Sequence, residues 1–207
     1  MTTRRYEQRL RAEAAEQTRR RILDAVYERL RAAPSEPVSL DQIARAASVA
    51  RSTVYLIFGS RAGLFDALAA DLLERGGFDS VVRAVAHPDA REHLRGGIRG
   101  GMRTFAVNRE VYRVLFSTAM LDPDATAGTV ARMEQRRAAG MAYLAQRLAE
   151  QGVLRPDVTV DQAADLLWVL TSFDTFDLLH TGRGLSAEQI AEVLITTAER
   201  SLTAAST

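Results

Sequence analysis

The 207-residue sequence predicts an all-α protein, and three observations lead to that fold class. Apolar residues recur every three or four positions over most of the chain, which is the period of a helix with one buried face. Glycines and prolines interrupt these runs at the places where helices must stop. Residues 39–64 contain two short helical patterns separated by a tight turn, which is the layout of a helix-turn-helix. We therefore expect an N-terminal three-helix domain over residues 1–61 and a C-terminal helical domain over residues 62–207.

The first helix is expected over residues 18–32. Residues 2–17 are polar and rich in arginine, and they form either a solvated arm or an extension of that helix, with the arm favoured. Residues 33–37 contain two prolines, which end the helix because proline lacks an N–H and restricts the residue before it. The apolar stripe of the first helix consists of Ile22, Leu23, Val26, Tyr27 and Leu30.

The helix-turn-helix begins at Ser39. Its hydroxyl and the Gln42 side chain have the spacing of a capping box, which opens a helix that ends near Ala47. Residues 48–49 make the turn. A second helix follows over residues 51–58, and it can pack on the first through Val54 and Phe58.

The distribution of charge agrees with a DNA-reading motif in this position. Residues 1–61 contain 12 Arg against 7 Asp or Glu, a net charge of +5. Residues 62–207 contain 15 Arg against 19 acidic residues, a net charge of −4. Such a division fits a protein of which only the first part contacts a polyanion. Solvated segments without any partner also carry excess charges of this size.

The motif resembles that of the tetracycline-repressor (TetR) family of bacterial transcription regulators. The family pattern runs Thr or Ser, Ile-Ala, Ala-Gly-Val-Ser, Thr-x-Tyr-x-x-Phe and Lys-Glu-x-Leu. The resemblance covers about a quarter of the chain, and the remaining helical pattern is also similar to this family. The matching residues here are Ser39, Ile43–Ala44, Ala47–Ala50, Thr53–Phe58 and Arg61–Leu64.

The resemblance implies a ligand-responsive transcriptional regulator, most often a repressor. Such a protein would bind a palindromic DNA operator as a homodimer and would be released by a small-molecule effector that moves the helix after the motif. The last two helices, at about 160–180 and 185–202, would form the dimer interface. The alternative is a ligand-binding or protein-interaction module that keeps the helix-turn-helix fold but has lost sequence-specific DNA binding.

The candidate DNA contacts come partly from chemistry and partly from the resemblance. The planar fork of Arg51 suits guanine O6 and N7, so Arg51 is the expected base reader. Thr53 and Tyr55 match the backbone-contacting pair of the family, and Arg61 matches its phosphate-binding Lys. The full set is Arg20, Ser39, Arg51, Ser52, Thr53, Tyr55, Leu56 and Arg61.

Three departures from the family pattern have physical consequences. Ser48 replaces the turn Gly, which is unfavourable if the backbone needs a positive φ. Ala50 replaces the capping Ser and forfeits about 1 kcal/mol of capping. Leu56 and Ile57 replace residues that are often polar or aromatic, so they either contact thymine methyl groups or pack on a neighbour.

The C-terminal part is expected to be almost entirely helical. The glycines at 96, 97, 100 and 101 weaken one helix and allow either close helix packing or space for a ligand. The helix at 160–180 is apolar on several sides and should be buried on several sides. The expected helices run from Leu64 to the Gly76–Gly77 pair and over 78–86, 89–107, 111–120, 126–151, 160–180 and 185–202, with a loop at 153–158.

An effector pocket lined by aromatic and methionine side chains is expected in the C-terminal domain, although such a stripe is also typical of plain core. Its candidate residues are Met102, Phe105, Tyr112, Phe116, Met120, Tyr143, Trp168 and Phe173.

No enzymatic activity, metal or cofactor is expected. The sequence has no P-loop, nucleophile elbow or dinucleotide-binding glycine motif, and its three histidines lack metal-ligand spacing. Cysteine is absent, which excludes disulfides. Because no run of 18 apolar residues and no signal-peptide pattern occurs, we expect a cytoplasmic protein without a membrane segment.

Overall fold

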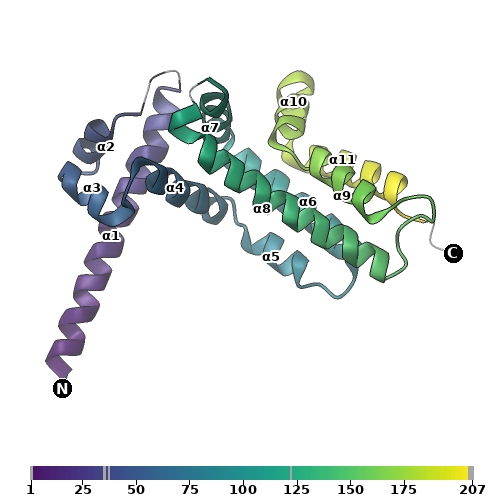
Figure 1. Ribbon diagram of the computed structural model, residues 1–207, viewed down its shortest axis with the longest axis horizontal. Helices are drawn as coiled ribbons and strands as arrows, with labels where there is room; N and C mark the ends of the chain where they lie inside the picture. Colours follow the sequence, from purple (N-terminus) through teal and green to yellow (C-terminus); the bar gives the residue numbers. More distant parts are fainter. Residues whose placement is uncertain (1, 35, 37, 122, 205–207) are drawn as a thin grey trace. The chain divides into compact units, whose positions relative to one another are not determined.

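A computed structural model describes residues 2–34, 36, 38–121 and 123–204, without the side chains of residues 2–5, 121 and 123–125. This part of the chain contains eleven α-helices and no β-strand, which confirms the all-α fold class (Figure 1). The chain divides into two compact units. Unit 1 comprises residues 1–71 and 113–130, and unit 2 comprises residues 72–112 and 131–207. The domain boundary expected between residues 61 and 62 stays a prediction.

Unit 1 is built around the helix-turn-helix. It contains α1 (Thr2–Ala32), α2 (Leu40–Ala46), α3 (Arg51–Phe58) and most of α4 (Arg61–Arg75). Parts of α7 (Arg109–Leu121) and α8 (Pro123–Glu150) complete it. Helix α1 packs against α2, and α2 against α3. The core of this unit lies under the motif and includes Ile22, Leu23, Val26, Leu30, Ile43, Val54, Leu64, Phe65 and Leu68.

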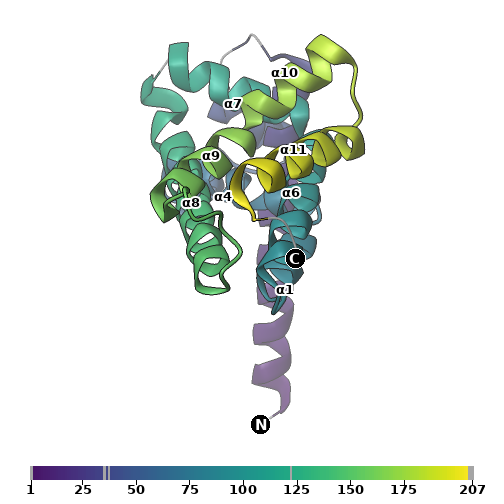
Figure 2. The ribbon, with the colours of Figure 1, turned by 90° about the vertical axis from the view of Figure 1, so that its right-hand side faces the viewer.

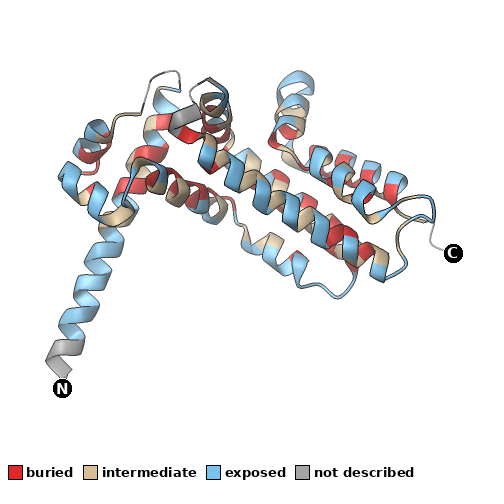
Figure 3. Cartoon of the chain, in the orientation of Figure 1, coloured by how far each residue is buried: buried red, intermediate tan, exposed pale blue. Residues whose placement is uncertain are grey.

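The N-terminal residues extend the first helix. Helix α1 begins at Thr2, so the favoured expectation of a non-helical arm is wrong and the alternative of a longer helix is correct. Every described side chain from Tyr6 to Gln17 is exposed, and burial starts with the stripe at Ile22 (Figure 3). A polar sequence of good helix formers can continue an anchored helix without a core of its own, since propagation costs less than nucleation.

Unit 2 holds the remaining helices. They are α5 (Asp79–Val85), α6 (Ala90–Val107), α9 (Val160–Leu170), α10 (Phe173–Arg183) and α11 (Ala187–Leu202). Helix α6 packs against α5, α10 and α11, and Figure 2 shows α11 beside α6. The loop expected at 153–158 is confirmed, and one isolated bridge joins Leu154 to Thr203.

Glycines in α6 allow α5 to approach closely. A Cβ on Gly96 would lie 2.7 Å from the Cβ of Ala84, and one on Gly100 would lie 2.6 Å from Cγ2 of Val81. No heavy atom lies within 4 Å of a Cβ built on Gly101. Of the two roles expected for these glycines, close helix packing is therefore the one that Gly96 and Gly100 serve.

Substitution of these glycines should separate packing from helix propensity. Gly96→Ala is expected to lower the free energy of unfolding by about 1–2 kcal/mol, because the new methyl group overlaps Ala84. Gly101→Ala, the matched control on the same helix, should raise it by about 0.5–1 kcal/mol. Urea denaturation of both variants measures the difference. Equal changes of the same sign would contradict the packing role of Gly96.

The expectation of a single helix over residues 160–180 is wrong. The chain breaks between α9 and α10 at Thr171 and Ser172, where the Ser172 hydroxyl accepts a hydrogen bond from the Thr175 N–H at 3.1 Å. This local side-chain bond competes with continued helix and starts a new one. Within the single chain Val169 is 55% exposed and Leu178 is 72% exposed, so the expectation of burial on several sides stays a prediction that depends on a second copy.

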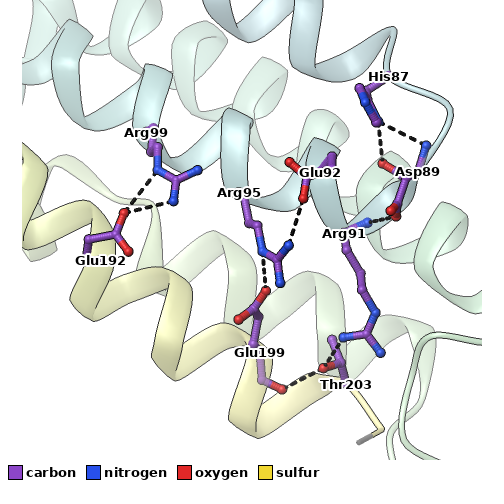
Figure 4. A network of polar contacts seen from close by, with 9 residues as sticks. All are labelled: His87, Asp89, Arg91, Glu92, Arg95, Arg99, Glu192, Glu199 and Thr203. Carbon is purple, nitrogen blue, oxygen red and sulfur yellow. Dashed lines mark hydrogen bonds and ion pairs between the residues drawn. The ribbon is translucent and has the colours of Figure 1, made fainter. Parts of the chain in front are cut away.

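Arginines spaced four residues apart on α6 join it to the C-terminal segment (Figure 4). Arg91 donates to Thr203 Oγ1 at 2.9 Å, Arg95 Nε lies 2.6 Å from Glu199 Oε1, and Arg99 Nη2 lies 2.9 Å from Glu192 Oε1. Each exposed pair contributes little alone, about 0–1 kcal/mol. Together the pairs fix the register of α11 along α6.

A buried histidine lies in the first turn of α6. His93 is 3% exposed, and its Nδ1 lies 3.2 Å from the Arg147 guanidinium. The same guanidinium donates to the carbonyls of Val85, His87 and Pro88 at 3.0, 2.7 and 2.9 Å. Burial, and then the charge of Arg147, lower the pKa of His93 to about 4. His93 is therefore neutral at pH 7 and accepts from Arg147.

Candidate nucleic-acid interface

Helices α2 and α3 form the expected helix-turn-helix. Ser39 is the N-cap of α2, but its hydroxyl makes no capping hydrogen bond, so the expected capping box is wrong. The start of α2 is held instead by the backbone, since the Ile43 N–H donates to the Ser39 carbonyl at 3.0 Å. Ala50 is the N-cap of α3 and supplies no side-chain cap, as its sequence implies.

The turn between the two helices passes through Ser48. Its φ is +54°, and it is the one non-glycine residue with positive φ in the described chain. The backbone strain expected from serine in place of the family glycine is therefore present, because a Cβ is unfavourable in the left-handed region.

We expect Ser48→Gly to raise the free energy of unfolding by about 0.5–1 kcal/mol by removing this strain. Thermal or urea denaturation measures the effect. Gly59→Ala is a control with the opposite expected sign. Gly59 follows α3 with a φ of +73°, so a side chain there should lower the free energy of unfolding. A loss of stability in Ser48→Gly would show that the Ser side chain itself holds the turn.

Helix α3 presents one face to solvent and buries the other. Arg51, Ser52, Tyr55 and Leu56 are all exposed, and at helical spacing they share one face. Val54, on the opposite face, is 2% exposed. Leu56 is 86% exposed, so it does not pack on a neighbour within the chain, which was one of its two expected roles. An exposed leucine between polar residues suits contact with a thymine methyl group.

Arg51 is held by side chains of both helices of the motif. Its Nη1 lies 3.1 Å from Oδ2 of Asp41 in α2, and its Nη2 donates to the Tyr55 hydroxyl at 3.4 Å. Its guanidinium also lies over the Tyr55 ring, 5.7 Å from the centroid. The bond accepted by Tyr55, and then the charge of Asp41, raise the pKa of Arg51. Asp41 thus orients the arginine and also competes with any base for its donors.

The other candidate contacts lie around α3 in unit 1. Thr53 is half-buried on α3, and Ser39 is half-buried at the start of α2. Arg61 begins α4 just after its cap Ser60, whose hydroxyl accepts from the Gly63 N–H at 3.0 Å. Its guanidinium lies over the Phe65 ring, and its buried Nε has no hydrogen-bond partner among the described residues.

Arg20 has a partner in unit 1 that the sequence did not reveal. Its Nη1 donates to Oδ1 of buried Asp71 at 2.7 Å, which joins α1 to α4. If Arg20 contacts a phosphate as expected, its guanidinium has to bind that phosphate while it also pairs with Asp71.

The structure brings together some of the candidate effector residues. The rings of Phe105, Tyr112 and Phe173 contact one another in unit 2, with centroid distances of 5.1–5.6 Å. Met102 is also buried on α6. Phe116 is half-buried on α7, and Met120 is 84% exposed.

Tyr143 and Trp168 are exposed and have other neighbours in unit 2. The Tyr143 ring lies beside His93, and the Trp168 ring lies under the guanidinium of Arg137. Asp177 on α10 pairs with Arg109 of α7, whose Nε lies 2.7 Å from its Oδ1.

Two ring residues of this cluster and one buried amide did not stand out in the sequence. Phe176 is fully buried and contacts Phe105 and Phe173, and the His180 ring stacks on Phe176 at 5.6 Å. Asn108 is fully buried between α6 and α7. A signal for it existed, because Asn108 is the single asparagine in the sequence and interrupts an apolar helical pattern.

Among the described residues, no helix combines the length and the apolarity that crossing a bilayer requires. In the same part of the chain, no group of three or more His, Cys, Asp or Glu side chains is arranged to hold a metal ion.

The fold and the exposed face of α3 define a helix-turn-helix DNA-binding protein with a helical C-terminal unit. Residues 22–68 match the family model of bacterial regulatory proteins, tetR family. Residues 22–68 are therefore similar to the N-terminal domain of TetR-family regulators, and this match supports a DNA-binding transcription regulator. No curated protein sequence matches the chain.

Solved structures with the same fold cover most of the chain. A TetR-family regulator from Syntrophomonas wolfei is 15% identical with a TM-score of 0.72, and the match covers 89% of this chain and 94% of that one. One from Rhodococcus sp. is 17% identical with a TM-score of 0.68, covering 91% and 100%. NalD of Pseudomonas aeruginosa, the secondary repressor of the MexAB-OprM multidrug efflux pump, is 24% identical with a TM-score of 0.67, covering 93% and 98%.

Proposed function

We propose that the protein is a repressor that binds a palindromic operator as a homodimer and is released by a small-molecule effector. The observation that carries this proposal is the exposed face of α3, on which Arg51, Ser52, Tyr55 and Leu56 stand together. An arginine fork and an exposed apolar side chain are the groups that read guanine and thymine in the major groove. Thr53, Tyr55, Ser39, Arg61 and Arg20 would contact phosphates around them.

Exposed apolar side chains support the homodimer. Trp168 and Val169 on α9, Leu178 on α10 and Val193 on α11 are each more than 40% exposed in the single chain. A second copy would cover them, and a two-fold arrangement would place two α3 helices in successive major grooves about 34–36 Å apart.

The effector response is supported by the composition of unit 2. The cluster of Phe105, Tyr112, Phe173 and Phe176 provides the apolar surroundings in which small molecules bind, close to the C-terminal end of α4. Two residues separate the end of α3 from the start of α4, so a change at the far end of α4 can reach the DNA-reading helix through one element.

Selection of binding sites from randomised duplex DNA tests the proposal. Repeated selection should enrich an inverted repeat, and analytical ultracentrifugation should show two protein chains on each duplex. Leu178→Glu is expected to weaken dimerisation and operator affinity together, whereas Arg83→Glu, on α5 and outside the helices proposed to form the dimer, should leave the dimer unchanged.

The alternative module that has lost sequence-specific DNA binding makes the opposite forecast. It would enrich no sequence, and any binding of DNA would be weak, strongly salt-dependent and indifferent to sequence. An enriched site that lacks two-fold symmetry and binds a single chain would support sequence-specific DNA binding and contradict the proposed homodimer.

A further inference from the structure

A fully buried asparagine has an unused hydrogen-bond acceptor. Asn108 is 0% exposed and lies where α6 ends and α7 begins. Its Nδ2 donates to the Leu72 carbonyl at 2.8 Å and to the Thr104 carbonyl at 3.1 Å. Its Oδ1 has no hydrogen-bond partner among the described residues. Leaving a buried amide oxygen unpaired is unfavourable, so such an atom requires an explanation.

Rotation of the amide by 180° does not remove the unpaired oxygen. The two neighbours of Nδ2 are carbonyl oxygens, which are acceptors only. A flipped amide would place Oδ1 against both of them and would leave Nδ2 without either partner. The orientation with a free Oδ1 is therefore the one that the hydrogen-bond chemistry selects.

Aromatic rings surround this position along the helix. Phe105 lies three residues before Asn108 and Tyr112 four residues after it, and their rings meet edge to face at 5.1 Å. Positions three before and four after Asn108 are the helical spacing of a shared face, and from this spacing we place the Asn108 side chain beside the two rings. Phe173 contacts both rings. Burial raises the pKa of Tyr112, as expected in a region of low polarity.

Phe105 is the least buried member of this cluster. It is half-buried, whereas Tyr112, Phe173 and Phe176 are each at most 3% exposed. Rotation of its ring toward solvent would open the cluster without disturbing the fully buried rings.

We propose that Asn108 Oδ1 is the hydrogen-bond acceptor of a binding site for a neutral, largely apolar molecule that carries a hydroxyl or N–H donor. The donor pairs with Oδ1, and the apolar body takes the place of the Phe105 ring against Tyr112 and Phe173. This inference rests on the proposed function, of which it specifies the effector class.

The same side chain links this site to α4. Asn108 Nδ2 holds the Leu72 carbonyl, and the Thr104 hydroxyl lies 3.3 Å from the Gly76 carbonyl just beyond α4. A Cβ on Gly76 would lie 2.7 Å from the Thr104 Cα, so the backbones are in close contact there. A ligand that pulls on Asn108 therefore acts directly on the last turn of α4.

Nuclear magnetic resonance of the amide of Asn108 tests the proposal in the intact protein. Because the sequence has one asparagine, isotopically labelled asparagine gives a single side-chain amide signal. Matched probes differ only in their donor: phenol and anisole, 2-naphthol and 2-methoxynaphthalene, cyclohexanol and methoxycyclohexane. At least one hydroxyl probe should shift the signal saturably, and its methyl ether should bind about fivefold more weakly.

Two variants separate the acceptor from general damage. Asn108→Leu should abolish the preference for hydroxyl over ether, measured by calorimetric titration. Thr104→Val removes the neighbouring hydroxyl and keeps Asn108, so the preference should remain. Where Asn108→Leu does not fold, the amide signal of the wild-type protein decides alone.

Absence of a shift with all three hydroxyl probes, or equal shifts with alcohols and ethers, would overturn the site. Neither outcome depends on DNA. A protein that shows the hydroxyl preference but is never released from its operator by the same probe would refute the proposed effector response and leave the binding site standing.

Discussion

Replacement of Arg51 by alanine is expected to cost about 1–3 kcal/mol of binding free energy at one base pair in each half-site and to relax the sequence preference there. The reason is the position of the arginine on the exposed face of α3, where its fork can donate twice to guanine O6 and N7. Binding measured against a set of duplexes, each with one base pair changed, shows which position loses its preference.

Arg61→Ala is the matched control for that measurement. Arg61 is at the start of α4 and is expected to contact phosphate, so its loss should weaken binding to all duplexes alike. It should also reduce the slope of log affinity against log salt by about 1. If both variants lost affinity equally for every sequence, Arg51 would not be a base reader.

A decrease of pH from 7 to 4 is expected to destabilise the protein by about 3 kcal/mol through His93 alone. The pKa of His93 is lowered to about 4 in the folded protein, against about 6.5 when unfolded, so the unfolded chain binds more protons in this window. The stability that neutral His93 contributes is therefore complete above about pH 6.5 and is lost as the pH falls toward 4. Protonation would also place two cations in contact, because Nδ1 lies 3.2 Å from Arg147.

His93→Gln isolates this contribution from the carboxylates that titrate in the same range. Glutamine retains an acceptor for Arg147 but has no proton to gain. Urea denaturation of both proteins between pH 4 and pH 7 should show a free-energy difference that changes with pH in this window. Parallel pH profiles would contradict the buried, neutral state of His93.

Much of the fold follows from the sequence because its helices are strongly patterned and clearly terminated. The glycine pair after α4 is one such signal, since Gly77 has a φ of +72°. The break at Thr171–Ser172 was missed because apolar periodicity runs through it and the deciding hydrogen bond is local to one serine hydroxyl. The length of α1 was missed because residues 2–17 bury nothing, so no apolar stripe marks them as helix.

The candidate site was predictable in outline and not in its pairings. The exposed positions of α3 follow from helical spacing around Val54, which was expected to pack against the preceding helix. The partners of Arg51 and Arg20 were not predictable, because Asp41 and Asp71 lie 10 and 51 residues away in the chain. Spacing within one helix carries no information on such tertiary contacts. The same limit applies to Asn108 and the Leu72 carbonyl, which are 36 residues apart.

The central claim is that the α3 face reads a DNA sequence, and a competition between two duplexes tests it most directly. One duplex carries the site enriched by selection, and the other carries the same bases in scrambled order. At physiological salt the protein should bind the selected duplex at least about 10³-fold more tightly. Equal affinity for the two duplexes, falling together as salt increases, would contradict the claim.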